Sequence, residues 1–86
     1  MATHDQVKIQ LQQVDETLQF AEEQLNNEKQ MQGGDEIKYD EAQQQLEQLN
    51  MQIERMLASA TPEQRDQLFR AQQQVNQMQN KMILGI

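Results

Sequence analysis

Few residues in this chain have side chains that could perform chemistry. It contains one histidine, His4, and no cysteine. Protein metal sites combine histidine, cysteine and carboxylate ligands at fixed spacings, and His4 has no second histidine to join it. A serine-type triad also needs a well-held histidine, and His4 lies near one end of the chain. We therefore expect no catalytic residue, no metal site and no cofactor, and interpret His4 as a solvated side chain.

The acidic residues do not supply a catalytic pair either. They occur next to each other in sequence, as Asp15-Glu16, Glu22-Glu23 and Asp40-Glu41. Adjacent residues diverge by about 100° around a helix, so such carboxylates point apart. A di-iron bundle would need Glu-x-x-His motifs, and none exists. The pair Gly33-Gly34 lacks the Gly-Lys-Ser/Thr ending of a phosphate-binding loop. The sequence thus indicates a protein that is not an enzyme.

Charge and composition narrow the class of partner. The chain has 86 residues, 20 of them glutamine, and a formal net charge of -7. An acidic chain is repelled by nucleic acid and by anionic membranes. No apolar run approaches the roughly 18 residues that a membrane span needs, and the first residues do not resemble a signal peptide. We expect a cytoplasmic protein that binds neither nucleic acid nor membrane.

Apolar residues recur at alternating spacings of three and four, which is typical of helices with one apolar seam, meaning a row of apolar side chains along one face. Glutamine is also a good helix former. The pattern predicts helices over about residues 4–31, 36–58 and 62–84. The three seams are Val7, Leu11, Val14, Leu18, Ala21 and Leu25; then Tyr39, Ala42, Leu46, Leu49, Ile53 and Met56; then Leu68, Ala71, Val75, Met78 and Met82.

Turn signals separate the three predicted helices. Glycine readily ends a helix, so Gly33-Gly34 is expected to close the first, and Asp35 to cap the second. Thr61, Pro62 and Gln64 form a capping box with proline at the first helical position, which starts the third. Short connections favour antiparallel neighbours. The sequence therefore predicts one all-α domain over residues 1–86, an antiparallel up-down-up three-helix bundle with coiled-coil-like seams.

Several large apolar residues miss the seams. Ile9, Phe20 and Met31 are 11 residues apart, close to three helical turns, so they should share a face roughly opposite the first seam. Such residues can be ordinary exposed side chains, or a second neighbouring helix can bury them. Alternatively, they form a surface for self-association or for a protein partner. The candidate interaction surface comprises Ile9, Phe20, Met31, Ile37, Met51 and Phe69.

The apolar end of the chain, residues 82–86, also allows two interpretations. The favoured one is a last helical turn packed over the end of the bundle, and the other is a docking tail. Two functional hypotheses follow from these surfaces. The first is a non-catalytic helical protein–protein interaction module of unknown role, self-associating, with a homodimer favoured. The alternative is a structural protein that assembles into higher-order helical oligomers.

Four segments of the chain resemble a known family. They are AEEQL at 21–25, YDEAQQQLE at 39–47, QRDQL at 64–68 and QNKM at 79–82. In these segments the chain is similar to the short uncharacterised YtzC-like proteins of Bacillus and its relatives, over nearly its whole length. The resemblance implies a bacterial host and a cytoplasmic setting, and it implies no activity. The Gly33-Gly34 pair is not matched to the family pattern.

Overall fold

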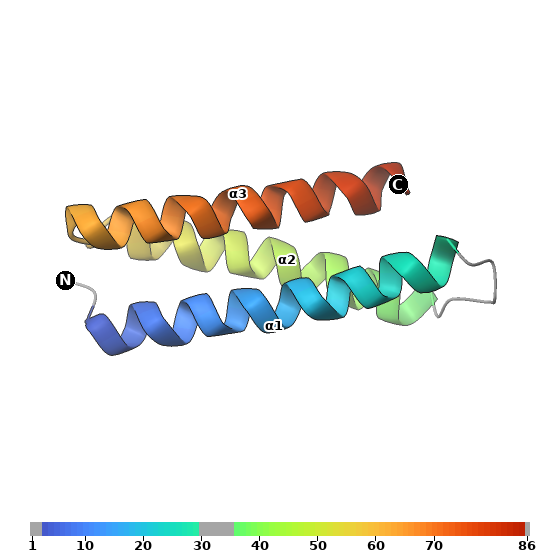
Figure 1. Ribbon diagram of the computed structural model, residues 1–86, viewed down its shortest axis with the longest axis horizontal. Coiled ribbons are helices and arrows are strands. Elements are labelled where there is room, and N and C mark those ends of the chain that lie inside the picture. The colour runs from blue at the N-terminus through green and yellow to red at the C-terminus, as the bar shows by residue number, and fades with distance from the viewer. Residues whose placement is uncertain (1–2, 30–35, 86) are drawn as a thin grey trace.

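Three helices make up the fold. The computed structural model describes residues 3–29 and 36–85, with α1 at His4–Lys29, α2 at Glu36–Leu57 and α3 at Pro62–Leu84. The chain runs up α1, returns along α2 and runs up again along α3, so α2 is antiparallel to both neighbours (Figure 1). The described residues contain no strand. The all-α, up-down-up three-helix bundle is confirmed, while Gly33-Gly34 and Asp35 lie outside the described residues.

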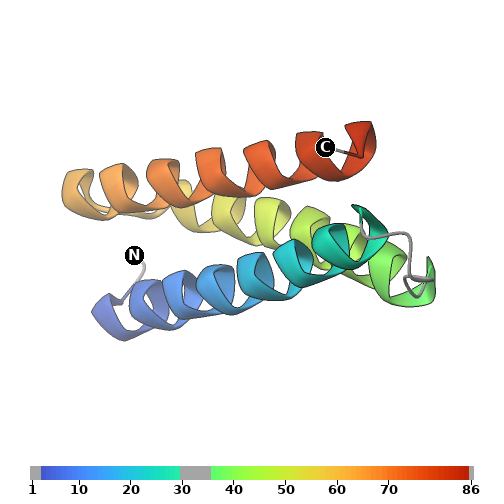
Figure 2. The same ribbon diagram turned by 45° about the vertical axis from the view of Figure 1, so that its right-hand side comes forward.

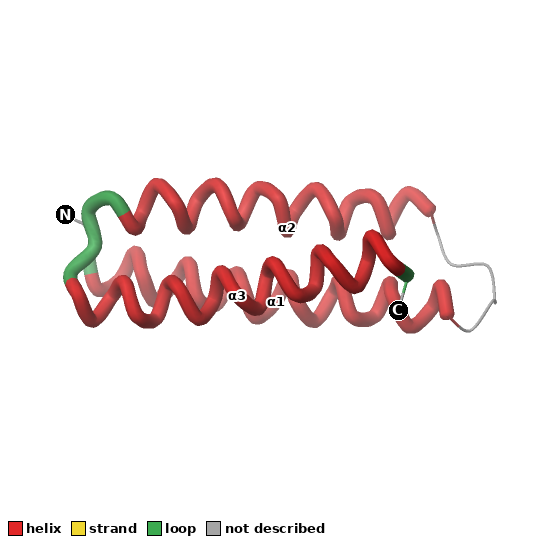
Figure 3. Tube along the Cα trace, turned by 90° about the horizontal axis from the view of Figure 1, so that it is seen from above, coloured by secondary structure: helices red, strands yellow, loops and turns green. Residues whose placement is uncertain are grey.

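The helices form a triangular bundle rather than a flat layer. Every pair of helices is in contact, and the bundle is 45 Å long. Turning the molecule separates the three rods in depth (Figure 2), and the view from above places α2 to one side of α1 and α3 (Figure 3). Each helix therefore packs against two others and must bury more than one row of side chains.

The α2–α3 turn follows the predicted capping chemistry. Thr61 is the N-cap of α3, and Pro62 begins the helix. The Gln64 backbone N–H donates to Thr61 Oγ1 at 3.3 Å, and the Thr61 N–H donates to Gln64 Oε1 at 3.0 Å. The same reciprocal pair joins Thr3 and Gln6 at the start of α1, with both distances 3.0 Å. Both caps satisfy backbone donors that a helix start leaves without partners.

Buried side chains of α2 and α3 recur with a seven-residue spacing, as in a heptad pattern. All five residues of the predicted third seam are buried, as are four of the six in the second seam. Tyr39 and Met56, at the two ends of the second seam, are partly buried against this core. The buried members are Ala42, Leu46, Leu49 and Ile53 in α2, and Leu68, Ala71, Val75, Met78 and Met82 in α3.

The predicted seam of α1 lies in the core, and two buried glutamines border it. Gln10 and Gln24 are buried, with 6% and 7% of their surface exposed, whereas Leu11 and Leu18 are only partly buried. All six predicted residues lie in or against the core, and Val7, Val14 and Ala21 form its central row. Because α1 touches two helices, this row is flanked by a polar row toward α2 and a leucine row toward α3. The polar row is Gln10, Thr17 and Gln24, and the leucine row is Leu11, Leu18 and Leu25.

The end of α3 differs from the favoured interpretation of the apolar tail. Met82 is buried, and its carbonyl accepts a hydrogen bond from the Tyr39 hydroxyl at 2.5 Å. Ile83 and Leu84 are instead mostly exposed. Gly85 takes a left-handed conformation with φ 73° and donates its N–H to the Lys81 carbonyl, which ends the helix. The last turn thus does not pack over the end of the bundle beyond Met82.

Candidate interaction surface

A groove lined with glutamine lies between α1 and α2. Its volume is about 470 Å³, and a second hollow of about 220 Å³ continues it toward the middle of the bundle. Gln13 and Gln52 line both. We name the two hollows together the glutamine groove, after the glutamines that line it: Gln6, Gln10, Gln13, Gln45, Gln48 and Gln52.

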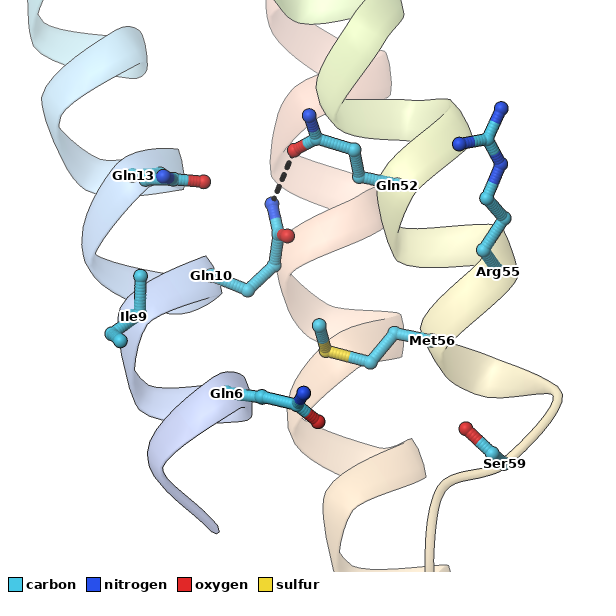
Figure 4. Close-up of a pocket in the computed structure, with 8 residues that line it drawn as sticks. All are labelled: Gln6, Ile9, Gln10, Gln13, Gln52, Arg55, Met56 and Ser59. Atoms are coloured by element: carbon cyan, nitrogen blue, oxygen red, sulfur yellow. Dashed lines mark hydrogen bonds between the residues drawn. The ribbon is translucent and has the colours of Figure 1, made fainter. Parts of the chain in front are cut away.

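The groove exists because α1 and α2 meet through polar side chains. Gln10 Nε2 donates to Gln52 Oε1 at 3.1 Å, joining the two helices across the groove (Figure 4). Met56 lines the groove from α2, while Gln6 and Ser59 lie at its lower end in the same view. The inner row of α1 consists of two valines and an alanine, which fill little space. Small apolar residues flanked by amides leave a shallow polar channel where larger apolar side chains would have closed it.

The described residues of the predicted surface come from all three helices. Ile9 borders the glutamine groove and is 55% exposed. Met51, Phe69 and Ile37 are 49%, 53% and 73% exposed on α2 and α3. Phe20 is partly buried and packs against the core. Met31 lies outside the described residues. Four of the six residues are therefore exposed, and they are distributed over all three helices.

The different positions of Ile9 and Phe20 have a geometric cause. Buried positions in the bundle repeat every seven residues, or 3.5 per turn relative to the neighbouring helices. On that frame an 11-residue step advances about 51° beyond three full turns. Phe20 is thus rotated from Ile9 toward α2, into the row of Gln6 and Gln13. The two residues therefore lie in adjacent rows of α1 and not in one straight row.

A polar cluster between α2 and α3 was missed by sequence reasoning. Asn50 Nδ2 donates to Asn76 Oδ1 at 2.7 Å and to Gln79 Oε1 at 3.1 Å. The Asn50 Oδ1 atom is buried and accepts no hydrogen bond from the described residues. Amide groups at these positions have no distinctive spacing in sequence, because the register of the two antiparallel helices decides which of them meet.

Residues considered for chemistry lie apart on the surface. His4 lines a hollow of about 670 Å³ with Glu63, Asp66 and Arg70, and all four side chains are exposed. Arg70 pairs with Asp66 across one helical turn at 3.1 Å, and both side chains are largely solvated. Within residues 3–29 and 36–85, no three histidine or acidic side chains come together as a metal site. No helix in this part of the chain is long and apolar enough to cross a bilayer.

Comparison with known proteins identifies the family. Residues 1–84 match the family model described as "Protein of unknown function (DUF2524)". The chain belongs to this family. It is also similar to the protein named "Uncharacterized protein YtzC" of Bacillus subtilis (strain 168), with 36% identity over 84 residues. The match covers 98% of this chain and 93% of that relative.

Membership of DUF2524 confirms the resemblance to YtzC-like proteins noted from four short segments. No solved structure matches the chain. The family description carries no activity, so a functional argument for this DUF2524 chain rests on its own surfaces. Among these, the glutamine groove and the exposed apolar residues are the most developed features.

Proposed function

We propose that the protein is a non-catalytic helical interaction module that self-associates. The observation that supports this most directly is the number of large apolar side chains left in water by a small bundle. They are Ile9, Ile37, Met51, Phe69, Ile83 and Leu84. Burying one such side chain fully contributes about 1.5–3 kcal/mol, so a partner that covers several of them gains substantially.

The composition of the core adds a second reason. The inner row of α1 is small, and two of its flanking positions are buried glutamines. A domain of this size buries only a modest fraction of its surface, so its stability is marginal. Association would add apolar contacts on the side of α1 that faces α2 through glutamines.

Mass measurement over a range of concentrations tests the proposal. Sedimentation equilibrium of the full chain, from about 1 µM to several hundred micromolar, is expected to show a rise from the 10.1 kDa monomer. The combined change Ile9→Gln, Met51→Gln and Phe69→Gln should reduce this rise while helicity persists. A matched control replaces one exposed glutamine on each helix by alanine, as Gln12→Ala, Gln44→Ala and Gln73→Ala. A wild-type chain that stays monomeric throughout rejects the proposal.

The alternative of a higher-order assembly protein is favoured by one observation. Exposed apolar residues occur on more than one side of the bundle, with Ile9 beside the glutamine groove and Met51 and Phe69 on other helices. Contacts through two different surfaces do not close and can propagate. The same experiment separates the candidates, because a closed dimer reaches a plateau at twice the monomer mass and an open assembly continues to grow.

A further inference from the structure

We infer that the face formed by α1 and α2 packs against the same face of a second copy, related by a two-fold axis that crosses the helices. This rests on the proposed self-association and specifies its surface, partner and orientation. The partner is a second copy because a two-fold rotation of this face brings opposite charges together and apolar residues together.

The first argument comes from the charges of α2. Glu41, Gln48 and Arg55 are seven residues apart, so they form one row on the heptad frame. Gln48 and Arg55 line the glutamine groove, and all three side chains are exposed. Neither Glu41 nor Arg55 makes an ion pair with another described residue. A two-fold axis at Gln48 packs this row antiparallel to the same row of the second copy. Arg55 of each copy then lies against Glu41 of the other, and the two Gln48 side chains face each other.

The second argument comes from α1 and is independent of charge. Ile9 is exposed beside the groove, and Phe20 continues the groove row of Gln6 and Gln13 with part of its surface exposed. The midpoint between Ile9 and Phe20 falls between Val14 and Asp15. A two-fold axis there brings Ile9 of one copy against Phe20 of the other. It also brings Glu16 opposite Gln13, whose amide can donate to the carboxylate.

The two midpoints lie at the same height along the bundle. The Gln10–Gln52 hydrogen bond and the hollow that Thr17 shares with Gln45 indicate the same register of α1 against α2. The midpoint in α1, between Val14 and Asp15, lies four and a half residues after Gln10. The midpoint in α2, Gln48, lies four residues before Gln52, which is the same direction along the bundle because the helices are antiparallel. The mismatch is half a residue, or about 0.75 Å at the helical rise of 1.5 Å per residue. One axis therefore satisfies both the charges of α2 and the apolar residues of α1.

The resulting arrangement is sterically ordinary. Within one chain α1 and α2 are antiparallel (Figure 1), and the axis packs each of them antiparallel to its own copy. Four helices, each antiparallel to its two neighbours, then surround the glutamine groove, as in common four-helix bundles. A face two helices wide along a 45 Å bundle is comparable with the ~800 Å² per partner of ordinary stable interfaces.

A charge exchange tests the inference on the full chain. Arg55→Glu and Glu41→Arg are each expected to raise the dimer dissociation constant about tenfold, because each creates two like-charge contacts across the axis. Mixing the two variants in equal amounts should form a heterodimer with nearly wild-type affinity, since both contacts then become attractive. Native mass spectrometry distinguishes the heterodimer from the homodimers by mass, and sedimentation gives the affinities.

Matched controls separate contact from net charge. Arg65→Glu and Glu47→Arg alter exposed residues outside this face and change the net charge by the same amounts. Arginine and glutamate both favour helix, but Arg55 lies in the last turn of α2, where glutamate interacts unfavourably with the helix dipole, so the helicity of all four variants is measured alongside their association. The inference predicts that neither control alters the dissociation constant by more than about twofold.

The outcomes distinguish this inference from the proposed function. Weakening by both variants with recovery in the mixture supports the two-fold contact. If wild type self-associates and the exchange has no effect, or the mixture does not recover, the face is wrong while self-association stands on another surface. If wild type is monomeric at several hundred micromolar, both proposals are overturned.

Discussion

Replacing the buried Gln10 by leucine is expected to stabilise the fold, although it removes a hydrogen bond between helices. The Gln10 side chain has 6% of its surface exposed and donates to Gln52 Oε1 at 3.1 Å. Burying a leucine side chain contributes about 1.5–3 kcal/mol, part of which the methylenes of Gln10 already supply. Losing a neutral hydrogen bond costs about 0.5–1.5 kcal/mol.

The balance favours leucine because of what remains on α2. Gln52 is exposed, so water can satisfy its carbonyl once Gln10 is gone, and no buried acceptor is left without a donor. We expect Gln10→Leu to raise the free energy of unfolding by about 1 kcal/mol. For a domain of this size that corresponds to a rise in Tm of about 4–8 °C.

Urea and thermal unfolding followed by circular dichroism measure this change. Both should be repeated at several protein concentrations, because association shifts the apparent stability. The dependence on urea should keep its slope, which reports the surface exposed on unfolding. Gln13→Leu is the control, since Gln13 lines the same groove but is exposed, and its change should stay within about 0.5 kcal/mol. If Gln10→Leu were less stable than wild type, the reasoning would be refuted. The Gln10 amide would then contribute more to the free energy of unfolding than one neutral hydrogen bond.

Two further changes test the ends of α3. Thr61→Ala removes the side chain that accepts from the Gln64 N–H and should lower the free energy of unfolding by about 1 kcal/mol in urea titration, whereas Ser59→Ala in the same turn should not. An unchanged Thr61→Ala midpoint would contradict the capping contribution. Tyr39→Phe removes the hydrogen bond to the Met82 carbonyl and should accelerate amide hydrogen exchange in the last two turns of α3 but not in its first turns. Equal acceleration along the helix would instead indicate global destabilisation.

The buried residues of α2 and α3 were predicted well because, in each helix, the two rows of positions that face the core are both occupied by apolar residues. Leu46 and Ile53 alternate with Ala42 and Leu49, so the apolar seam and the buried face coincide. The break at Thr61 was predictable because proline and a capping box are local signals that need no tertiary information.

Helix α1 was harder to predict for a physical reason. Periodicity identified the six apolar residues of the α1 seam, which all lie in or against the core, but it did not identify the two glutamines that are buried beside them. A helix with two neighbours buries a wide sector, and polar residues with long apolar stems can occupy its border. Gln10 and Gln24 therefore gave no signal of burial.

Predicting which residues meet at the candidate surface required the packing and register of the helices, which the sequence does not give. Whether Ile9 and Phe20 share a face depends on the helical frame that packing imposes, and whether Asn50 meets Asn76 depends on the register of α2 against α3. The relation between Glu41 and Arg55 required the same kind of information. The spacing of Glu41 and Arg55 can be read from the sequence. The position of α2 along the bundle relative to α1 cannot, and the Gln10–Gln52 hydrogen bond indicates it.

The polar contact between α1 and α2 links the stability of the monomer to its proposed assembly. Apolar residues toward α2 would bind α1 more tightly and close the groove, leaving a smoother face with fewer amide donors. The glutamines instead keep donors and acceptors available beside Glu16 and Glu41, where a second copy can use them. Gln10→Leu should then strengthen the monomer without strengthening the dimer, because Gln10 lies beneath the face and the contacts across the two-fold axis come from exposed residues. A dimer that tightens in proportion to the monomer's stability would mean that association depends on the core and not on this face.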